Sequence, residues 1–280
     1  MAQKHTFPMV LVHGAWHGAW CWAKVLPKLR EKGFRVYTPT QTGVGERTSE
    51  LSEDIIVETF IQDIADFLTT HDLHDVILVG HSFAGISISG VADRMPERIR
   101  HLVYLDALLL QSGQKVFDII PPDLAAARRE LAMQTSQGLS LPAPEPAALG
   151  VTDEVDAQWV KENCTPHPLS TYESNLHLNH PLGNGLPASY IAVTPHYLVT
   201  TSSRDYACSR SDWKYMEIEA GHDAMVTSPA HLCRLLEDIA VHKPVRKPSM
   251  EDRVLKFIEG HNREIWTGIA LLVLLVVVFK

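Results

Sequence analysis

"DVILVGHSFAG", residues 75–85, decides the fold: an apolar run ends abruptly in a polar histidine and serine among small residues. An apolar run of this length is typical of a strand buried on both faces. The stretch that follows, residues 84–95, has the composition of a helix. The sequence therefore predicts a buried strand that turns directly into a helix at Ser82.

Such a turn can be a nucleophile elbow, which holds a serine hydroxyl clear of the sheet. The elbow needs small residues two positions before and after the serine, and Gly80 and Ala84 stand there. Ala84 replaces the usual second glycine, and Gly85 follows it. The alternative is an ordinary buried strand that ends in a serine turn. We predict an elbow with Ser82 as the nucleophile.

The rest of the chain alternates short apolar runs with helical patterns, of which residues 56–71 show an apolar helical face. Residues 18–33 also read as a helix, with a kink or a late start at Pro27. This alternation predicts an α/β fold with a mostly parallel six-stranded sheet flanked by helices. The expected strands are residues 9–15, 34–40, 75–82, 99–107, 196–203 and 214–221.

Residues 108–195 interrupt the alternation with a proline-rich stretch and short helical pieces. An insertion this long between the fourth and fifth strands is usually a cap or lid. We therefore predict an α/β core over residues 1–107 and 196–243, with the cap between them. Active sites in such sheets gather at the carboxyl ends of the strands.

The composition narrows the possible partners. The chain has 280 residues and a formal charge of −8, which argues against nucleic-acid binding. Its cysteines form no CxxC pair, so we expect no metal site, no disulfide and a reducing compartment. No secretory signal is recognisable at the start of the chain, which predicts a cytoplasmic, non-secreted catalytic domain. The cysteines are Cys21, Cys164, Cys208 and Cys233.

The end of the sequence is different. Residues 244–264 are polar and read as a linker, and residues 265–280 contain an uncharged apolar run. The run is 15 residues long, short of the roughly 20 that span a bilayer as a helix. It is either a short tail anchor that attaches the protein to a membrane, or an apolar helix buried in a dimer or against the domain. The oligomeric state is left open.

Two further segments fit a serine nucleophile. In "VLVHGAW" (10–16) the first strand ends at a His-Gly turn, so the backbone amides of Ala15 and Phe83 are candidate oxyanion donors. "MEIEAGHDAMVTSP" (216–229) places His222 after the last strand, where the general base is expected. The alternative interpretations are that the His-Gly segment is only a tight turn and that His222 is an ordinary surface histidine.

The acid that orients the histidine is Asp205 or Asp106. Asp205 fits the chain order serine, acid, histidine, but only 17 residues separate it from His222. Asp106 is the rival because it also follows a strand. Asp223 is adjacent to His222 and is too constrained by the backbone to reach its ring. We favour Asp205.

Five ordered motifs carry a resemblance: "LVHGAWHGAWCW", "YTPTQTGVGER", "VILVGHSFAG", "HLVYLDA" and "GHDAMVTSP". Together, over about residues 8–242, the chain resembles the α/β-hydrolase superfamily. More narrowly it is similar to the branch of plant methyl esterases, hydroxynitrile lyases and bacterial pyrethroid-hydrolase-like carboxylesterases. The resemblance implies carboxylic-ester hydrolysis without a cofactor, with Ser82, His222 and Asp205 as the triad.

The lyases of this branch have a threonine after the first-strand histidine and a lysine after the catalytic histidine. This chain has Gly14 and Asp223 there, so nothing supplies positive charge for a departing cyanide. We expect a serine esterase (EC 3.1.1) that works through an acyl-enzyme. The alternatives are a lyase or cyclase that uses the triad for proton transfer, and a catalytically silent ligand-binding protein.

Aromatic residues surround the predicted chemistry. Trp16 follows the oxyanion segment, and Trp159 and His167 fall in the predicted cap. Such residues indicate a pocket for a small apolar ester, although core packing explains any single tryptophan as well.

Overall fold

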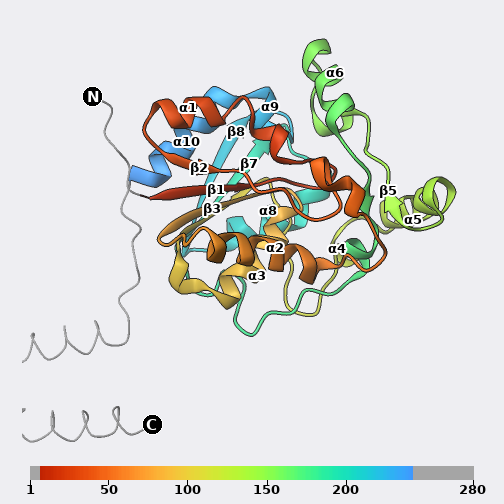
Figure 1. Cartoon of the computed structure of the whole chain (residues 1–280), viewed down its shortest axis with the longest axis horizontal. Helices are drawn as coiled ribbons and strands as arrows, with labels where there is room; N and C mark the ends of the chain where they lie inside the picture. Colours follow the sequence, from red (N-terminus) through yellow and green to blue (C-terminus); the bar gives the residue numbers. More distant parts are fainter. Residues whose placement is uncertain (1–6, 242–280) are drawn as a thin grey trace, which may run out of the picture. The chain divides into compact units, whose positions relative to one another are not determined.

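The structure, a computed structural model, describes residues 7–241. Its main element is a parallel sheet of six strands in the order β2-β1-β3-β4-β7-β8 (Figure 1), which confirms the predicted α/β-hydrolase fold class. The central strands are buried along their length, as an apolar run covered on both faces requires. The strands are β1 (Pro8–Val12), β2 (Arg35–Tyr37), β3 (Val76–His81), β4 (Ile99–Leu105), β7 (Ala188–Thr194) and β8 (Trp213–Glu219).

Helices cover both faces of the sheet. Figure 1 shows α1 (Leu26–Glu31) and α10 (Pro229–Val241) on one face, with α2 (Val57–Thr70) and α3 (Ala84–Arg94) on the other. The predicted apolar face of α2 faces the core, because Phe60, Ile64 and Leu68 are almost fully buried and Phe67 is half-buried. The helix predicted over residues 18–33 begins late: a short 3₁₀ turn precedes α1, and Pro27 occupies its first turn, where no intrahelical N–H is needed.

The register of the sheet brings the ends of several strands together. His81 lies beside Leu105, and Leu105 lies beside Ile191. Because parallel strands end at the same edge, the residues that follow β3 and β4 become neighbours. This edge therefore collects the side chains of Ser82 and Asp106.

The fifth strand is not where the sequence predicts it. Residues 196–203 form a 3₁₀ turn and the start of α8 (Thr201–Ser209), whereas β7 covers residues 188–194. Pro195 follows β7 and cannot donate a ladder hydrogen bond, so the strand ends there. The β-branched residues after it favoured a strand on propensity alone, and their tertiary context overrides that preference.

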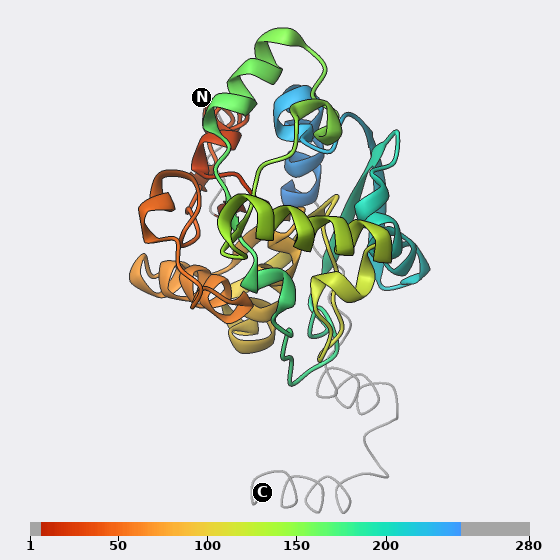
Figure 2. The same cartoon turned by 90° about the vertical axis from the view of Figure 1, so that its right-hand side faces the viewer.

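The sheet consequently resumes at Ala188, and the inserted segment runs over residues 106–187, not 108–195. Figure 2 shows this segment from the side on which it projects. Its two short strands pair antiparallel. The segment contains α4 (Val116–Ile119), α5 (Pro122–Ser136), β5 (Ser140–Leu141), α6 (Glu154–Asn163), β6 (His167–Pro168) and α7 (Ser170–Glu173), and the remaining helix of the core is α9 (Ala224–Thr227).

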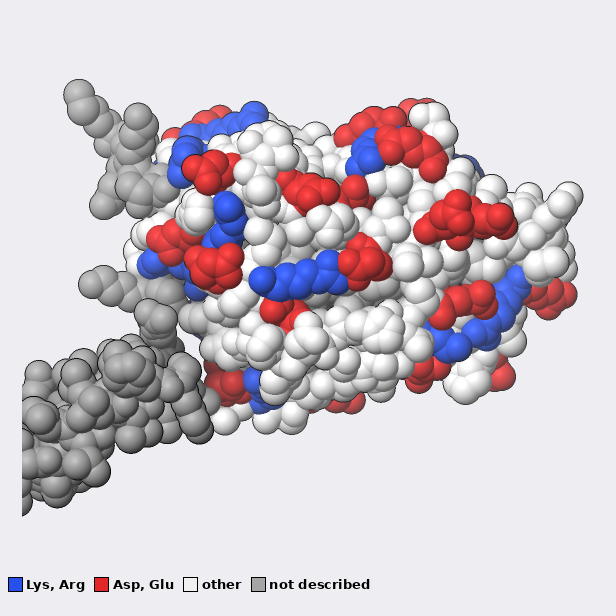
Figure 3. Space-filling view, turned by 60° about the horizontal axis from the view of Figure 1, so that its bottom comes forward, with Lys and Arg blue, Asp and Glu red and all other residues white. Residues whose placement is uncertain are grey.

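The predicted linker and apolar tail, residues 244–280, lie outside the described residues. Within residues 7–241, no helix combines the length and the apolar character needed to cross a bilayer. On the face drawn in Figure 3, acidic and basic side chains alternate in small groups instead of forming a continuous basic surface.

Candidate active site

Ser82 lies at a sharp turn between β3 and α3. Its backbone has a φ of 53°, a left-handed conformation that is strained for a serine and characteristic of a nucleophile elbow. A Cβ on Gly80 would lie 2.7 Å from the carbonyl oxygen of Ala84, so the turn requires glycine there. The side chain is 9% exposed. The local sequence thus produces the turn that it predicts.

His222 meets Ser82 across the edge of the sheet. It follows β8, and its Nε2 lies 2.8 Å from Ser82 Oγ, where it accepts the hydroxyl proton. Two contacts fix the imidazole: His81 Nε2 donates to the His222 carbonyl at 3.0 Å, and the Tyr197 ring stacks on it with centroids 3.9 Å apart. The structure therefore brings together the predicted nucleophile and base.

The acid next to His222 is Asp106, not Asp205. His222 Nδ1 donates to Asp106 Oδ2 at 2.6 Å, and Thr200 Oγ1 donates to Asp106 Oδ1 at 3.0 Å. Asp205 is exposed on α8 and pairs with Arg204 at 3.2 Å. The prediction that Asp205 orients His222 is wrong, because residues 201–209 form a helix and the Asp205 carboxylate on it lies in solvent.

The turn after β1 packs directly against the nucleophile. A Cβ on Gly14 would lie 2.8 Å from Ser82 Cβ, so only glycine allows this approach. The next residue is Ala15, whose carbonyl accepts from His17 Nδ1 at 2.6 Å. On the other side, Phe83 directly follows Ser82 and is the N-cap residue of α3. The two predicted oxyanion donors, Ala15 and Phe83, thus flank Ser82 from two segments.

A buried ion pair that the sequence did not indicate supports this turn. His17 Nε2 donates to Asp223 Oδ2 at 3.0 Å, and both side chains are buried. Burial opposes a charge on His17, but the Asp223 carboxylate outweighs this and raises its pKa. Burial tends to raise the pKa of Asp223, and His17 nevertheless lowers it. Asp223, adjacent to the base, therefore fixes the β1 turn and not the His222 ring.

His81 stays neutral beside this pair. Burial lowers its pKa well below the ordinary value, and the neighbouring His222 adds to that shift. One atom each of His81, His222 and Asp223 lies within 4.8 Å of the others, a spacing that suits a metal ion. In this arrangement both ring nitrogens of His222 already bond Ser82 and Asp106, so the residues present fit a proton-transfer site better than a metal centre.

Two of the three predicted pocket residues, His167 and Trp16, belong to a ring cluster around Phe83, the residue after Ser82. His167 is fully buried, and its ring centroid is 4.9 Å from that of Phe83. Trp16 is also buried, with its ring 6.2 Å from His167 and its indole N–H donated to the Leu141 carbonyl at 3.2 Å. These rings therefore pack together on the side chain of Phe83, the residue that follows Ser82.

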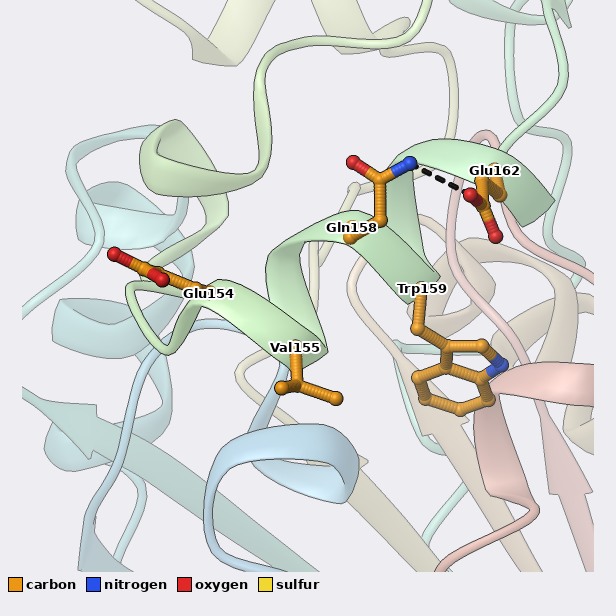
Figure 4. A pocket seen from close by; sticks show the side chains of 5 residues that line it. All are labelled: Glu154, Val155, Gln158, Trp159 and Glu162. Atoms are coloured by element: carbon orange, nitrogen blue, oxygen red, sulfur yellow. Dashed lines mark hydrogen bonds between the residues drawn. The ribbon is translucent and has the colours of Figure 1, made fainter.

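Trp159 occupies a different place. It lines a shallow depression on α6 with Glu154, Val155, Gln158 and Glu162 (Figure 4). Its ring meets Trp20 edge-on at 5.2 Å, and Lys24 Nζ lies 5.8 Å from the ring centroid. These contacts are with the helical turn after β1 and not with Ser82 or His222.

Comparison with known proteins agrees with the fold and the order of these motifs. The profile of the alpha/beta hydrolase family matches residues 9–234, most of the chain. The chain belongs to this family. Its relatives are named esterases, which confirms the predicted enzyme class, a carboxylesterase-type hydrolase.

The similar proteins include esterases from bacteria and plants. The chain is 37% identical to the carbendazim hydrolyzing esterase of Nocardioides sp. (strain SG-4G), over 81% of this chain and 97% of that protein. It is 28% identical to methylesterase 10 of Arabidopsis thaliana, over 86% of this chain and 94% of that protein. The solved structure of an extracellular alpha/beta-hydrolase from a Paenibacillus species superimposes with a TM-score of 0.72 at 25% identity, over 83% of this chain and 98% of that one.

Proposed function

We propose that the chain is a serine carboxylesterase in which Ser82 is the nucleophile, His222 the general base and Asp106 the acid that orients it. The observation that carries this proposal is the continuous set of contacts from Asp106 Oδ2 through the imidazole to Ser82 Oγ, at 2.6 and 2.8 Å. This geometry matches a catalytic triad. Family membership adds an independent reason, since the relatives are esterases.

The reaction begins when Ser82 Oγ attacks the ester carbonyl carbon while its proton passes to His222 Nε2. The amides of Ala15 and Phe83 donate to the oxyanion that develops. They lower the barrier because they stabilise this oxyanion more than they stabilise the planar ester. The C–O bond then breaks, and the departing alkoxide takes the proton from His222. A water molecule, deprotonated by the same imidazole, attacks the acyl carbon; the bond from that carbon to Ser82 Oγ then breaks, Oγ takes the proton back from His222, and the acid leaves.

Asp106 acts by fixing which nitrogen of His222 carries the proton. Since Nδ1 donates to the carboxylate, Nε2 is left as the acceptor that Ser82 needs. The carboxylate also stabilises the imidazolium that forms during attack. Thr200, which donates to the other oxygen of Asp106, holds the carboxylate in this orientation.

The surroundings favour a small ester with apolar groups. Phe83, His167 and Tyr172 form a connected ring cluster beside the nucleophile, with centroids 4.9 to 5.5 Å apart. Apolar rings of this kind bind acyl or alcohol groups mainly by burying their surface. The relatives named as esterases agree with this substrate class.

Hydrolysis of p-nitrophenyl acetate and butyrate by the Ser82→Ala variant tests the proposal. We expect turnover to fall to the level of residual transition-state binding, about 10³-fold or more below the native chain. Ser202→Ala, an exposed serine on α8, is the matched control and should leave turnover unchanged. Full activity in the Ser82 variant contradicts the proposal, whereas an acyl adduct trapped on Ser82 in a quenched reaction supports hydrolysis over the lyase alternative.

A further inference from the structure

Arg128 lies over the aromatic wall of the candidate site. It belongs to α5, the helix that crosses the front of the inserted segment in Figure 2. Its Cζ is 5.5 Å from the ring centroid of Trp16 and 5.4 Å from that of Tyr172. Its Nη1 is buried and has no hydrogen-bond partner in the described part of the chain. The side chain of Arg128 is thus half-buried against two aromatic rings, hydrogen-bonded to Tyr172, and left with an unused donor at Nη1.

Both rings connect this guanidinium to the nucleophile. Trp16 follows the predicted oxyanion residue Ala15 along the chain. The ring centroid of Tyr172 is 5.3 Å from that of Phe83, the residue after Ser82. Arg128 is therefore linked through these two rings to the residues that flank Ser82.

Electrostatic effects place Arg128 near the base as well. Burial raises the pKa of Tyr197 to about 12, and the charge of Arg128 is the main influence that opposes this rise. Tyr197 is the residue that stacks on His222. Burial also raises the pKa of Tyr172, again against the charge of Arg128.

No carboxylate among residues 7–241 forms an ion pair with Arg128. The next residue, Arg129, does have one: its Nε donates to Glu173 at 2.9 Å. The two rings stabilise the cation, and the Tyr172 hydroxyl hydrogen-bonds to the guanidinium, but Nη1 itself has no oxygen partner among residues 7–241. Buried charges are normally paired, because an unpaired one loses its hydration without replacement. Nη1 is therefore a donor that an oxygen of a ligand could use.

We propose that Arg128 binds a carboxylate of the substrate, so that the preferred substrates are esters that also carry an ionised acid group. The inference rests on the proposed esterase function and names its substrate class. The ester carbonyl would lie at Ser82, an apolar spacer would pack along Phe83 and Tyr172, and the carboxylate would accept from the guanidinium. Arginine suits this role because its planar fork matches the two oxygens of a carboxylate.

Two methyl esters of similar chain length test the proposal: monomethyl adipate, which is anionic, and methyl hexanoate, which is neutral. We expect Arg128→Gln to reduce kcat/KM for monomethyl adipate by about 10- to 100-fold, chiefly through KM, since hydrogen bonds to charged groups are worth this much. Turnover of methyl hexanoate should change less than about threefold. Arg128→Lys should retain part of the preference, and Arg129→Gln should leave both esters unaffected.

An equal loss with both esters would show that Arg128 only supports packing, and no loss with either would show that it binds no substrate oxygen. A binding titration separates this question from the esterase proposal. Monomethyl adipate should bind Ser82→Ala at least about tenfold more tightly than it binds Ser82→Ala/Arg128→Gln. Equal affinities overturn the role of Arg128 even if the ester is hydrolysed. Unequal affinities sustain it even if hydrolysis does not depend on Ser82.

Discussion

Replacing Asp106 by asparagine removes one charge from the candidate triad and keeps its shape. In the native chain the carboxylate accepts the Nδ1 proton of His222 at 2.6 Å. An amide nitrogen facing Nδ1 instead makes that nitrogen an acceptor, which moves the ring proton to Nε2. His222 then cannot accept the proton of Ser82. We expect kcat for p-nitrophenyl acetate to fall by about 10⁴, equivalent to about 5.4 kcal/mol of transition-state stabilisation.

The fold should survive this change. Asp106 has a φ of 39°, and asparagine tolerates this left-handed conformation as well as aspartate does. The amide oxygen can still accept from Thr200. The loss should therefore appear in kcat, with a melting temperature lower by only a few degrees, about the effect of 1 kcal/mol.

Asp205→Asn is the matched control because Asp205 is exposed on α8 and, within residues 7–241, its hydrogen bonds are with its neighbour Arg204. We expect its kcat to stay within about twofold of the native value, as for other surface substitutions. Steady-state kinetics on both variants, with circular dichroism to verify folding, checks the prediction. A large loss in the Asp205 variant together with an active Asp106 variant would refute the reasoning.

Three further results are expected. Gly14→Ala places a Cβ 2.8 Å from that of Ser82, so kcat should fall by about 10²-fold and unfolding should cost about 1–3 kcal/mol less, as measured by kinetics and urea denaturation. Asp223→Asn should lower the free energy of unfolding by about 3–5 kcal/mol near pH 5.5 and by less near pH 9. The reason is that the raised pKa of His17 contributes stability that is complete below the unfolded pKa of about 6.5 and is lost as the pH rises through the folded pKa. An equal effect at both pH values contradicts this. Iodoacetamide should label the exposed Cys208 first, without loss of activity, because burial raises the thiol pKa of the other three cysteines. Peptide mass spectrometry identifies the labelled cysteine, and rapid labelling of any of the other three would contradict the prediction.

The elbow and the base could be predicted because their signals are local. The steric need for small residues around Ser82 is visible in the sequence, and His222 follows the last strand at the edge where parallel strands end. Both positions depend on short-range chain geometry. The structure adds the distance between them, which no pattern of residues contains.

The acid could not be decided from the sequence. Asp106 and Asp205 were both placed after a strand, and the choice between them depended on where the fifth strand lies. The predicted strand lies eight residues too late, because residues 196–203 and β7 each contain three β-branched residues and propensity alone does not separate them. With β7 ending at Thr194, the helix α8 carries Asp205 away from His222.

Contacts between residues that are far apart in the sequence could not be predicted either. The ion pair between His17 and Asp223 joins residues 206 positions apart. Arg128, in the inserted segment, contacts Trp16, and the sequence does not show how this segment aligns with the core. Contacts of this kind come from how the insertion packs on the sheet and not from the composition of either segment.

Reaction with a fluorophosphonate tests most directly whether the hydroxyl at the elbow is activated by the imidazole beside it. The intact chain should gain the mass of one phosphonyl group, mapped by peptide sequencing to Ser82, and the rate of labelling should fall sharply in His222→Ala. An adduct on another residue, or a Ser82 that reacts equally fast without His222, would contradict the account.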